Sequence, residues 1–283
     1  MNKLNENIFH QYNKWKTGYE RKENSLQMRL SNFLSNEVNH LYVDYCHISK
    51  DGKHVDCGTD MRILDEDLIN GKFPFPFGKI HGDFNCDGCA ELISLEGAPE
   101  EVDGNFTCDG CEELISLEGA PKEVGKSFMC FSCPNLTSLK GAPEKVGGQF
   151  ACSDCSNLTS LKGAPKEVKK DFFCAKCENL TSLEGAPEKV ADGFNCINCK
   201  NLQSLEGAPK EVGGWFDCTG CKSLTSLEGA PEKVGGSFTC IYCDNLTSLE
   251  HLPKKIGGVL RVDERFRGKI PSDVKIIMGI QYY

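Results

Sequence analysis

The chain has 283 residues, among them 18 cysteines, and a formal net charge of −9. A hydrophobic fraction of 39% with 16 phenylalanines predicts a folded protein, whereas no apolar run is long enough to span a membrane and the polar start lacks the apolar core of a signal peptide. We therefore expect a cytoplasmic protein without a membrane partner, and the lack of a basic stripe argues against a nucleic-acid partner.

The N-terminal segment, residues 1–41, is expected to be helical because two apolar stripes recur at helical spacing. The first stripe is Ile8, Tyr12, Trp15 and Tyr19, and the second is Leu26, Leu30, Phe33, Leu34, Val38 and Leu41. A stacked repeat array exposes an apolar end and an unpaired strand edge, so we interpret the segment as a cap. The alternative is a helical pair that binds a partner or oligomerises.

Residues 42–81 are expected to form a β-hairpin and an irregular first solenoid turn. The Asp51-Gly52 pair is typical of a two-residue hairpin turn and places Cys46 opposite Cys57, where thiol packing is favoured over a disulfide. Three histidines lie nearby, His40, His47 and His54. Strand alternation puts the last two on the face away from the cysteines, so a His/Cys metal cluster is not favoured.

Residues 82–257 contain eight repeats of 22 residues, each reading F-x-C-x-x-C-x-x-L-x-S-L, and seven of them continue with x-G-A-P-x-x-V. The first cysteines are Cys86, Cys108, Cys130, Cys152, Cys174, Cys196, Cys218 and Cys240, and the second lie three residues further on. A unit this short cannot bury a core alone, so equivalent positions of neighbouring units must cover one another. The repeats therefore predict a solenoid.

Within each unit, the F-x-C alternation predicts a short strand with Phe and Cys facing inward, and the strands stack in parallel at about 4.8 Å per turn. Gly-Ala-Pro turns the chain, after which Val returns to the core. Similar strands are expected at Met61–Ile63 and, in the C-terminal cap of residues 258–283, at Leu260 and Val262. The fold class is mainly β with a short helical N-terminal segment.

The residues Phe106, Cys108, Cys111 and Leu114 resemble the leucine-rich repeat pattern L-x-x-L-x-L-x-x-[N/C]-x-x-L. The S-L-E-G-A-P-E-K-V segment resembles a repeat type of tailed-phage and some bacterial proteins. The resemblance covers residues 82–257 and implies a curved solenoid whose concave strand face binds another macromolecule without catalysing a reaction. Here Phe and Cys occupy the strand slots that hold leucine in that family.

Three interpretations compete for the sixteen repeat cysteines. They act as small buried apolar groups, which we favour because Val262 and Ile63 occupy the equivalent slot where the array ends. Alternatively, two turns supply four thiolates to a zinc ion, although nothing distinguishes odd from even repeats as a metal shared by pairs would. Disulfides need an oxidising compartment. We expect no metal and no cofactor.

The outward strand positions differ between repeats and predict the functional surface. Several large apolar side chains on one strand face suggest a docking surface for a protein partner. The candidate partner-binding residues are Met129, Phe131, Phe173, Ile197, Trp215, Ile241 and Tyr242. Acidic residues in the first third, Asp83, Asp87 and Asp109, are expected to orient that partner by charge. The alternative is neutral drift among repeats that bind nothing.

No catalytic motif is evident in the chain. The serine of each S-L pair, Ser94 to Ser248, is invariant in all eight repeats. Catalysis needs one serine with one base, whereas a ladder needs the same turn hydrogen bond at every level. We therefore expect a non-enzymatic protein.

Overall fold

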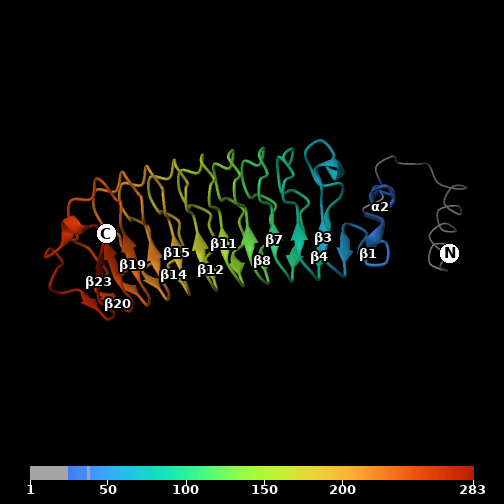
Figure 1. Ribbon diagram of the computed structural model, residues 1–283. Coiled ribbons are helices and arrows are strands. Elements are labelled where there is room, and N and C mark those ends of the chain that lie inside the picture. Colours follow the sequence, from blue (N-terminus) through green and yellow to red (C-terminus); the bar gives the residue numbers. More distant parts are fainter. Residues whose placement is uncertain (1–24, 37–38) are drawn as a thin grey trace, which may run out of the picture.

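The 22-residue period of the sequence becomes the repeat of the structure, because residues one period apart lie in register on neighbouring strands. The computed structural model describes residues 25–36 and 39–283, which form an elongated rod of stacked coils (Figure 1). These described residues are mainly β, with 21% strand and 7% helix. The predicted solenoid of 22-residue units with parallel strands is confirmed.

The F-x-C segments form one parallel sheet, which we call sheet B. Its phenylalanines are buried, and each pairs with the phenylalanine of the next repeat, as Phe128 does with Phe150. The strands predicted at Met61 and Leu260 extend this sheet on either side of the eight repeats. Sheet B contains β3 (Met61–Arg62), β5 (Phe84–Asn85), β7 (Phe106–Thr107), β9 (Phe128–Met129), β11 (Phe150–Ala151), β13 (Phe172–Phe173), β15 (Phe194–Asn195), β17 (Phe216–Asp217), β19 (Phe238–Cys240), β21 (Leu260–Val262) and β23 (Ile280–Tyr282).

The valine after each Gly-Ala-Pro belongs to a second sheet, sheet A, which the sequence analysis missed. The valine side chain points into the core and the charged residue before it points outward, as in Lys145 and Val146. All neighbours pair in parallel except β1 and β2. Sheet A contains β1 (Cys46–Ile48), β2 (Val55–Cys57), β4 (Phe77–Ile80), β6 (Glu101–Val102), β8 (Glu123–Val124), β10 (Lys145–Val146), β12 (Glu167–Val168), β14 (Lys189–Val190), β16 (Glu211–Val212), β18 (Lys233–Val234), β20 (Lys255–Ile256) and β22 (Lys275–Ile276).

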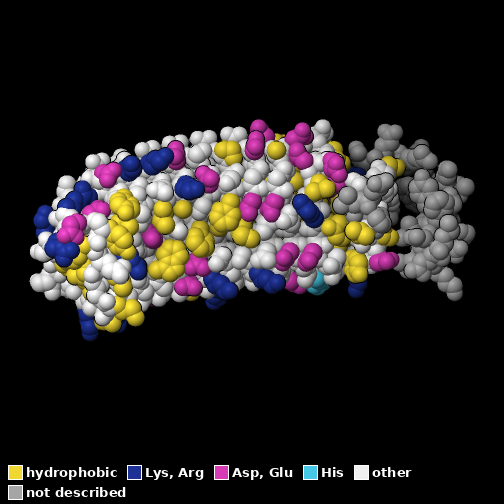
Figure 2. Space-filling view, in the orientation of Figure 1, with side chains coloured by type: hydrophobic (Ala, Val, Ile, Leu, Met, Phe, Trp, Pro, Cys, Tyr) yellow, Lys and Arg dark blue, Asp and Glu magenta, His cyan; other side chains and the backbone are white. Residues whose placement is uncertain are grey.

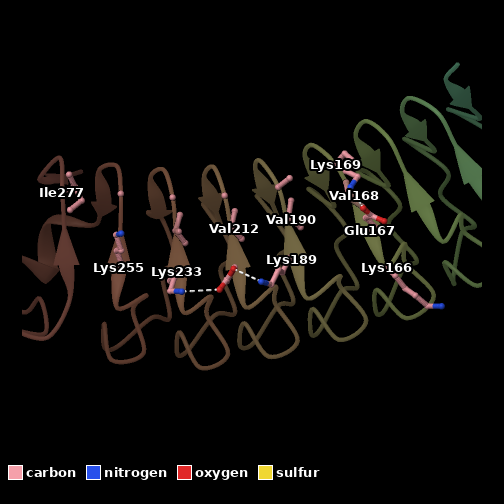
Figure 3. Close-up of a pocket in the computed structure, with 16 residues that line it drawn as sticks. Lys166, Glu167, Val168, Lys169, Lys189, Val190, Val212, Lys233, Lys255 and Ile277 are labelled. Carbon is pink, nitrogen blue, oxygen red and sulfur yellow. Dashed lines mark hydrogen bonds and ion pairs between the residues drawn. The ribbon is translucent and has the colours of Figure 1, made fainter. Parts of the chain in front are cut away.

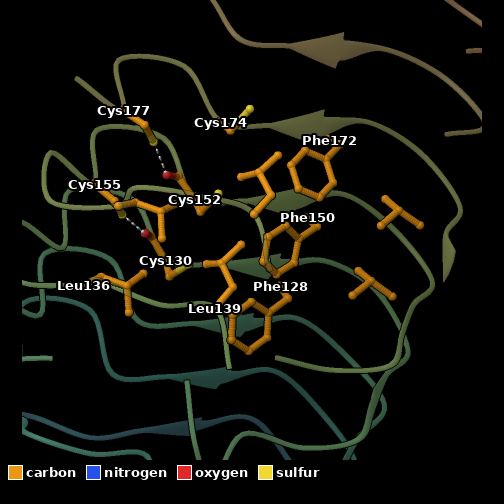
Figure 4. Close-up of a cluster of buried hydrophobic side chains, with 14 of the residues drawn as sticks. Phe128, Cys130, Leu136, Leu139, Phe150, Cys152, Cys155, Phe172, Cys174 and Cys177 are labelled. Atoms are coloured by element: carbon orange, nitrogen blue, oxygen red, sulfur yellow. Dashed lines mark hydrogen bonds between the residues drawn. The ribbon is translucent and has the colours of Figure 1, made fainter. Parts of the chain in front are cut away.

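Phenylalanine rings run through the core as one continuous stack. The rings of Phe194 and Phe216 have centroids 5.3 Å apart and planes 6° from parallel. Figure 4 shows three rings of this stack beside the buried leucines and cysteines. Each of these phenylalanines is fully buried, which stabilises the fold by roughly 1.5–3 kcal/mol per ring. Neighbouring coils therefore bury their phenylalanines against one another.

Glycine occupies the turn between the two sheets in seven repeats, whereas His251 holds the equivalent position in the eighth with a φ of +67°. Gly119 has a φ of +97°, and a Cβ at this position would lie 2.4 Å from the carbonyl oxygen of Leu95 in the preceding coil. A side chain would therefore be strained in its backbone conformation and would also collide with the neighbouring coil. This explains the glycine of the Gly-Ala-Pro motif.

The described N-terminal residues include one α-helix, α2 (Leu26–Leu34). Its N-cap is Ser25, whose hydroxyl accepts a hydrogen bond from the N–H of Met28. Phe33 is buried and packs edge-on against Phe75, with ring centroids 5.3 Å apart. The helix therefore lies against the aromatic segment of the first coil.

The second apolar stripe is shorter than predicted. The helix ends at Leu34, and the 3-10 turn η1 (Asn39–Tyr42) carries Leu41 with 66% of its surface exposed. Leu41 does not join the stripe because η1 redirects the chain toward the hairpin. The first predicted helix and Val38 lie outside the described residues.

The hairpin of β1 and β2 has the predicted register, with Cys46 opposite Cys57, but its loop is longer than the predicted two-residue turn, since the last backbone hydrogen bond between the two arms joins Ser49 and His54. Both thiols are free, and their Sγ atoms lie 2.8 Å apart. On the other face, the Asp56 carboxylate lies 3.9 Å from His47 Nε2 and 3.6 Å from His54 Nε2. A further 3-10 turn, η2 (Asp65–Asp67), follows β3.

The C-terminal segment adds another coil to both sheets through β22 and β23. Leu260 and Val262 are fully buried, so the ninth strand closes over the eighth repeat, and η3 (Glu264–Phe266) buries Phe266. The outermost coil leaves Ile277 and Met278 53% and 73% exposed. The tail therefore covers the repeats but does not bury its own apolar run.

Candidate binding face

The variable residues lie on the outer face of sheet B, which we call the binding face. Three outward columns cross it, because equivalent residues of successive coils lie next to one another. The first column is the residue immediately before each phenylalanine, and the second is the residue immediately after it. The third column is the residue that directly follows the first cysteine of each repeat. Figure 2 shows hydrophobic side chains distributed along the rod between charged ones.

The candidate residues are mostly half-buried rather than fully exposed. Tyr242 is 56% exposed, whereas the other six predicted residues have intermediate burial. Neighbours in the same column cover one another: Ala151 lies in register between Met129 and Phe173 and is only 1% exposed. The expectation that every such position faces solvent is therefore wrong for Ala151, and also for Thr107 and Thr239.

Trp215 and Phe173 form an aromatic pair although they come from different coils. Their ring centroids lie 6.2 Å apart at an interplanar angle of 50°. The indole of Trp215 lies over Gly193 of the intervening coil. A Cβ on Gly193 would lie 2.2 Å from the indole Cε2 atom. The structure therefore brings these two candidates together over a gap that only glycine leaves open.

The first column otherwise caps the backbone of the next coil, a role that sequence reasoning missed. Asp83 Oδ1 accepts a hydrogen bond from the N–H of Asn105 at 2.7 Å, and Asn105 Oδ1 accepts one from Ser127 at 3.1 Å. Asp171 Oδ1 accepts one from the N–H of Gly193 at 2.9 Å. The recurrence of Asp, Asn and Ser at this position is the sequence signal that could have revealed this capping role.

Carboxylates dominate the third column at the N-terminal end of the binding face. Asp87 Oδ1 accepts the N–H of Asp109 at 2.8 Å, and Asp109 Oδ1 accepts the N–H of Phe131 at 2.6 Å. Burial raises the pKa of Asp109 to about 6, opposed by the Phe131 hydrogen bond and reinforced by the Asp87 charge. The face thus changes from acidic to apolar along the rod.

The second cysteine of each repeat donates its thiol hydrogen to a backbone carbonyl of the preceding coil. Cys155 donates to the carbonyl of Cys130 at 3.2 Å, and Cys177 to that of Cys152 at 3.2 Å. Burial raises the pKa of the Cys174 and Cys240 thiols well above the ordinary value. The first cysteines, such as these two, therefore fill the core as protonated groups, whereas the second cysteines satisfy buried carbonyls.

All eighteen cysteines are free and buried. Within residues 25–36 and 39–283, no group of three or more His, Cys, Asp or Glu side chains is arranged to hold a metal ion. A thiol that coordinates zinc must first lose its proton, which burial opposes. The geometry therefore favours packing and hydrogen bonding as the role of the cysteines.

The outer face of sheet A carries charges that alternate between coils. Before each valine, from the second repeat to the seventh, the order Lys-Glu alternates with Glu-Lys. Glu211 is 3.0 Å from Lys189 and 3.4 Å from Lys233, one in each adjacent coil (Figure 3). The premise used above against zinc shared by pairs of repeats, that nothing distinguishes odd from even repeats, is therefore wrong. This face largely neutralises its own charges.

The repeated serines make the same turn hydrogen bond along the array. Ser94 Oγ accepts the N–H of Glu96 at 3.0 Å, and Ser138 Oγ accepts that of Lys140 at 3.1 Å. Seven of the eight serines make this bond to the residue two positions on. They therefore serve the turn, as the ladder interpretation predicts.

These features define the chain as a β-solenoid repeat protein with one variable strand face and one charge-paired strand face. No protein-family model, curated protein or solved structure matches it. Among the described residues, none of the helices has the length and apolar character needed to cross a bilayer.

Proposed function

We propose that this protein is a non-enzymatic scaffold that binds a protein partner on the outer face of sheet B. The observation that carries the proposal is the pair of Trp215 and Phe173, which holds two half-buried aromatic rings together on the strand face. Aromatic side chains fixed in this way are the usual anchors of protein interfaces. Met129, Phe131, Ile197, Ile241 and Tyr242 extend the apolar surface on either side.

The partner that fits this surface presents apolar side chains followed by basic ones. The apolar part would contact the aromatic pair, and Lys or Arg side chains would lie near Asp87 and Asp109. Charge at one end of an interface fixes the orientation of the partner more than it adds affinity. The opposite face is a poorer candidate because Glu211 and its neighbours already pair their charges.

The resemblance to leucine-rich repeats supports the same conclusion. We propose that the protein belongs among leucine-rich-repeat-like scaffolds and that the binding face is the concave one. The likeness to tailed-phage repeats suggests a virion-associated or host-directed role. We place the protein in the cytoplasm.

A displayed library of short random peptides provides the probe for a test. Peptides selected on the intact protein should combine aromatic or aliphatic residues with Lys or Arg at one end. Trp215→Ser and Phe173→Thr should each weaken their binding about tenfold or more. Serine and threonine occupy the equivalent slots in other repeats, at Ser237 and Thr239, so neither change should disturb folding.

Glu206→Lys is a matched control, because it changes an exposed residue of the turn after Leu205 rather than of the binding face. Unaltered peptide affinity in the Trp215 and Phe173 variants, with melting temperatures preserved, would refute the proposed face. A large loss of stability in these variants would show that the two rings act as core instead.

A further inference from the structure

Charge is distributed unevenly along the rod. Residues 82–125 contain twelve acidic side chains and one basic, whereas residues 126–257 contain fifteen of each. Residues 254–275, at the other end, contain seven basic and three acidic side chains. Figure 2 shows acidic side chains concentrated over the N-terminal coils and basic ones at the C-terminal end. The two ends therefore have opposite charge.

The first two repeats carry a surface that combines acidic and apolar residues, which we call the acidic patch. It consists of Glu91, Ile93, Glu112, Glu113 and Ile115. Ile93 and Ile115 are 43% and 59% exposed, although the same slot holds Thr or Gln in every later repeat. Within the described chain, no basic side chain pairs with these three glutamates. This patch is absent from the rest of the array.

The last coils carry a basic and apolar surface, which we call the basic patch. It consists of Lys254, Lys255, Lys275, Ile277 and Met278. Here the alternation of sheet A fails, since Lys255 lies in register between Lys233 and Lys275. No carboxylate in the part of the chain that the structure describes pairs with the three patch lysines, although Glu232 lies one period before Lys254 and Asp273 lies two residues before Lys275.

Like charges on adjacent strands repel each other, so the basic patch is unfavourable on its own. An acidic surface placed against it would relieve that repulsion and would cover Ile277 and Met278. Among the described residues, the large exposed apolar side chains other than Tyr242 lie before residue 116 or after residue 276. The exposed apolar surface thus coincides with the two regions of opposite charge.

We propose that the acidic patch of one molecule docks on the basic patch of a second copy of this chain. The two patches lie at opposite ends of a rigid rod, so a single molecule cannot bring its own patches together. The contact is heterologous, joining different surfaces of the two copies. It is independent of the binding face on sheet B, which stays free in the assembly.

Sedimentation velocity of the full chain over a range of concentrations at low salt tests the proposal. The protein should self-associate, and added salt should weaken the association because exposed charges are screened. Lys255→Glu should abolish it while maintaining or raising the melting temperature, since glutamate restores the alternation between Lys233 and Lys275. The double change Ile93→Thr and Ile115→Thr should weaken association about tenfold or more without unfolding the coils.

A mixing experiment distinguishes this contact from other forms of association. Lys255→Glu and the double variant Glu112→Lys, Glu113→Lys should each be monomeric alone, yet should form a complex when mixed, because each retains the intact patch that the other lacks. Lys170→Glu, a change in the middle of the rod, is the control and should associate normally. Trp215→Ser should also associate normally, which separates this inference from the proposed function.

Three results would overturn the proposal. The unaltered protein would remain monomeric at every concentration in low salt. Alternatively, the patch variants would associate as strongly as the unaltered protein, or the two charge-reversed variants would fail to form a complex when mixed.

Discussion

The indole ring of Trp215 lies across the backbone of Gly193, close enough that a Cβ on residue 193 would fall 2.2 Å from Cε2. This contact joins two consecutive coils and holds the indole beside Phe173, two coils away from its own strand. The proposed binding face therefore depends on a residue that itself contributes no side chain.

Gly193→Ser should displace the indole without unfolding the coil. Serine occupies the equivalent position at Ser127 and Ser237, so the backbone accepts it. Tryptophan emission should shift to longer wavelength as the ring becomes more solvated, and peptide affinity should fall as it does for Trp215→Ser. Unchanged emission would show that the ring does not depend on the glycine. Gly148→Ser, in a turn remote from Trp215, is the comparison.

Substitutions of the two cysteines in one repeat should differ in cost. Cys152→Val should cost less than about 1.5 kcal/mol, because Val262 already occupies that slot in the ninth strand. Cys155→Val should cost more, since it leaves the buried Cys130 carbonyl without its thiol donor, and Cys155→Ser should retain part of that bond. Urea unfolding measures these differences. Equal costs for the two valine variants would argue against a hydrogen-bonding role.

Protein purified without added zinc should contain no stoichiometric metal, and a chelator should leave its melting temperature unchanged. The reason is that the repeat thiols are buried, that burial raises the pKa of first cysteines such as Cys174 and Cys240, and that the second cysteines donate hydrogen bonds to carbonyls. Elemental analysis together with thermal melting checks this. About one zinc per pair of coils would instead support the metal-stabilised alternative.

The stability contribution of Asp109 should depend on pH. Its folded-state pKa is about 6 against a reference of 3.8, so the folded protein retains a proton that the unfolded chain releases. The resulting stabilisation is fully present below the reference value and is lost as pH rises through 6. As pH rises from 3.8 to 6, the unaltered protein should therefore lose this stabilisation whereas the Asp109→Asn variant should not, so the variant gains stability relative to the unaltered protein. Melting curves across this range test it, and a pH-independent difference would contradict it.

Reversing the charge of Glu211 should lower the melting temperature. Glu211 lies between Lys189 and Lys233, so Glu211→Lys would place three lysines in register on adjacent strands. The loss should shrink at high salt, where exposed charges are screened. Glu206→Lys, an exposed change outside these columns, should show no such loss. A salt-independent effect would point to packing instead of charge.

The sequence predicted those parts of the fold that depend on the residues of one coil and on the equivalent residues one period further along the chain. Phe150 and Cys152 alternate with an outward residue, so their burial followed from the strand period. Leu260 and Val262 were found by adding one period to the eighth repeat. The hairpin register of Cys46 and Cys57 followed from centring the turn on Asp51 and Gly52.

Other features depend on contacts that one coil does not reveal. A strand of only two residues, such as Lys145 and Val146, has no alternation to detect, so sheet A was missed. The donor role of Cys155 depends on a carbonyl in the preceding coil. The burial of Ala151 is set by its larger neighbours in register, and the pairing of Trp215 with Phe173 depends on the glycine between them.

The alternating order of Lys and Glu determines how many repeats can be added or removed without bringing like charges together. Removing the fifth repeat alone would bring the Lys166-Glu167 pair against Lys210-Glu211, so that identical charges met at the new junction. Removing two consecutive repeats would restore opposite charges there. Gene duplications and losses that preserve the fold should therefore add or remove coils in even numbers, and designed variants should do the same.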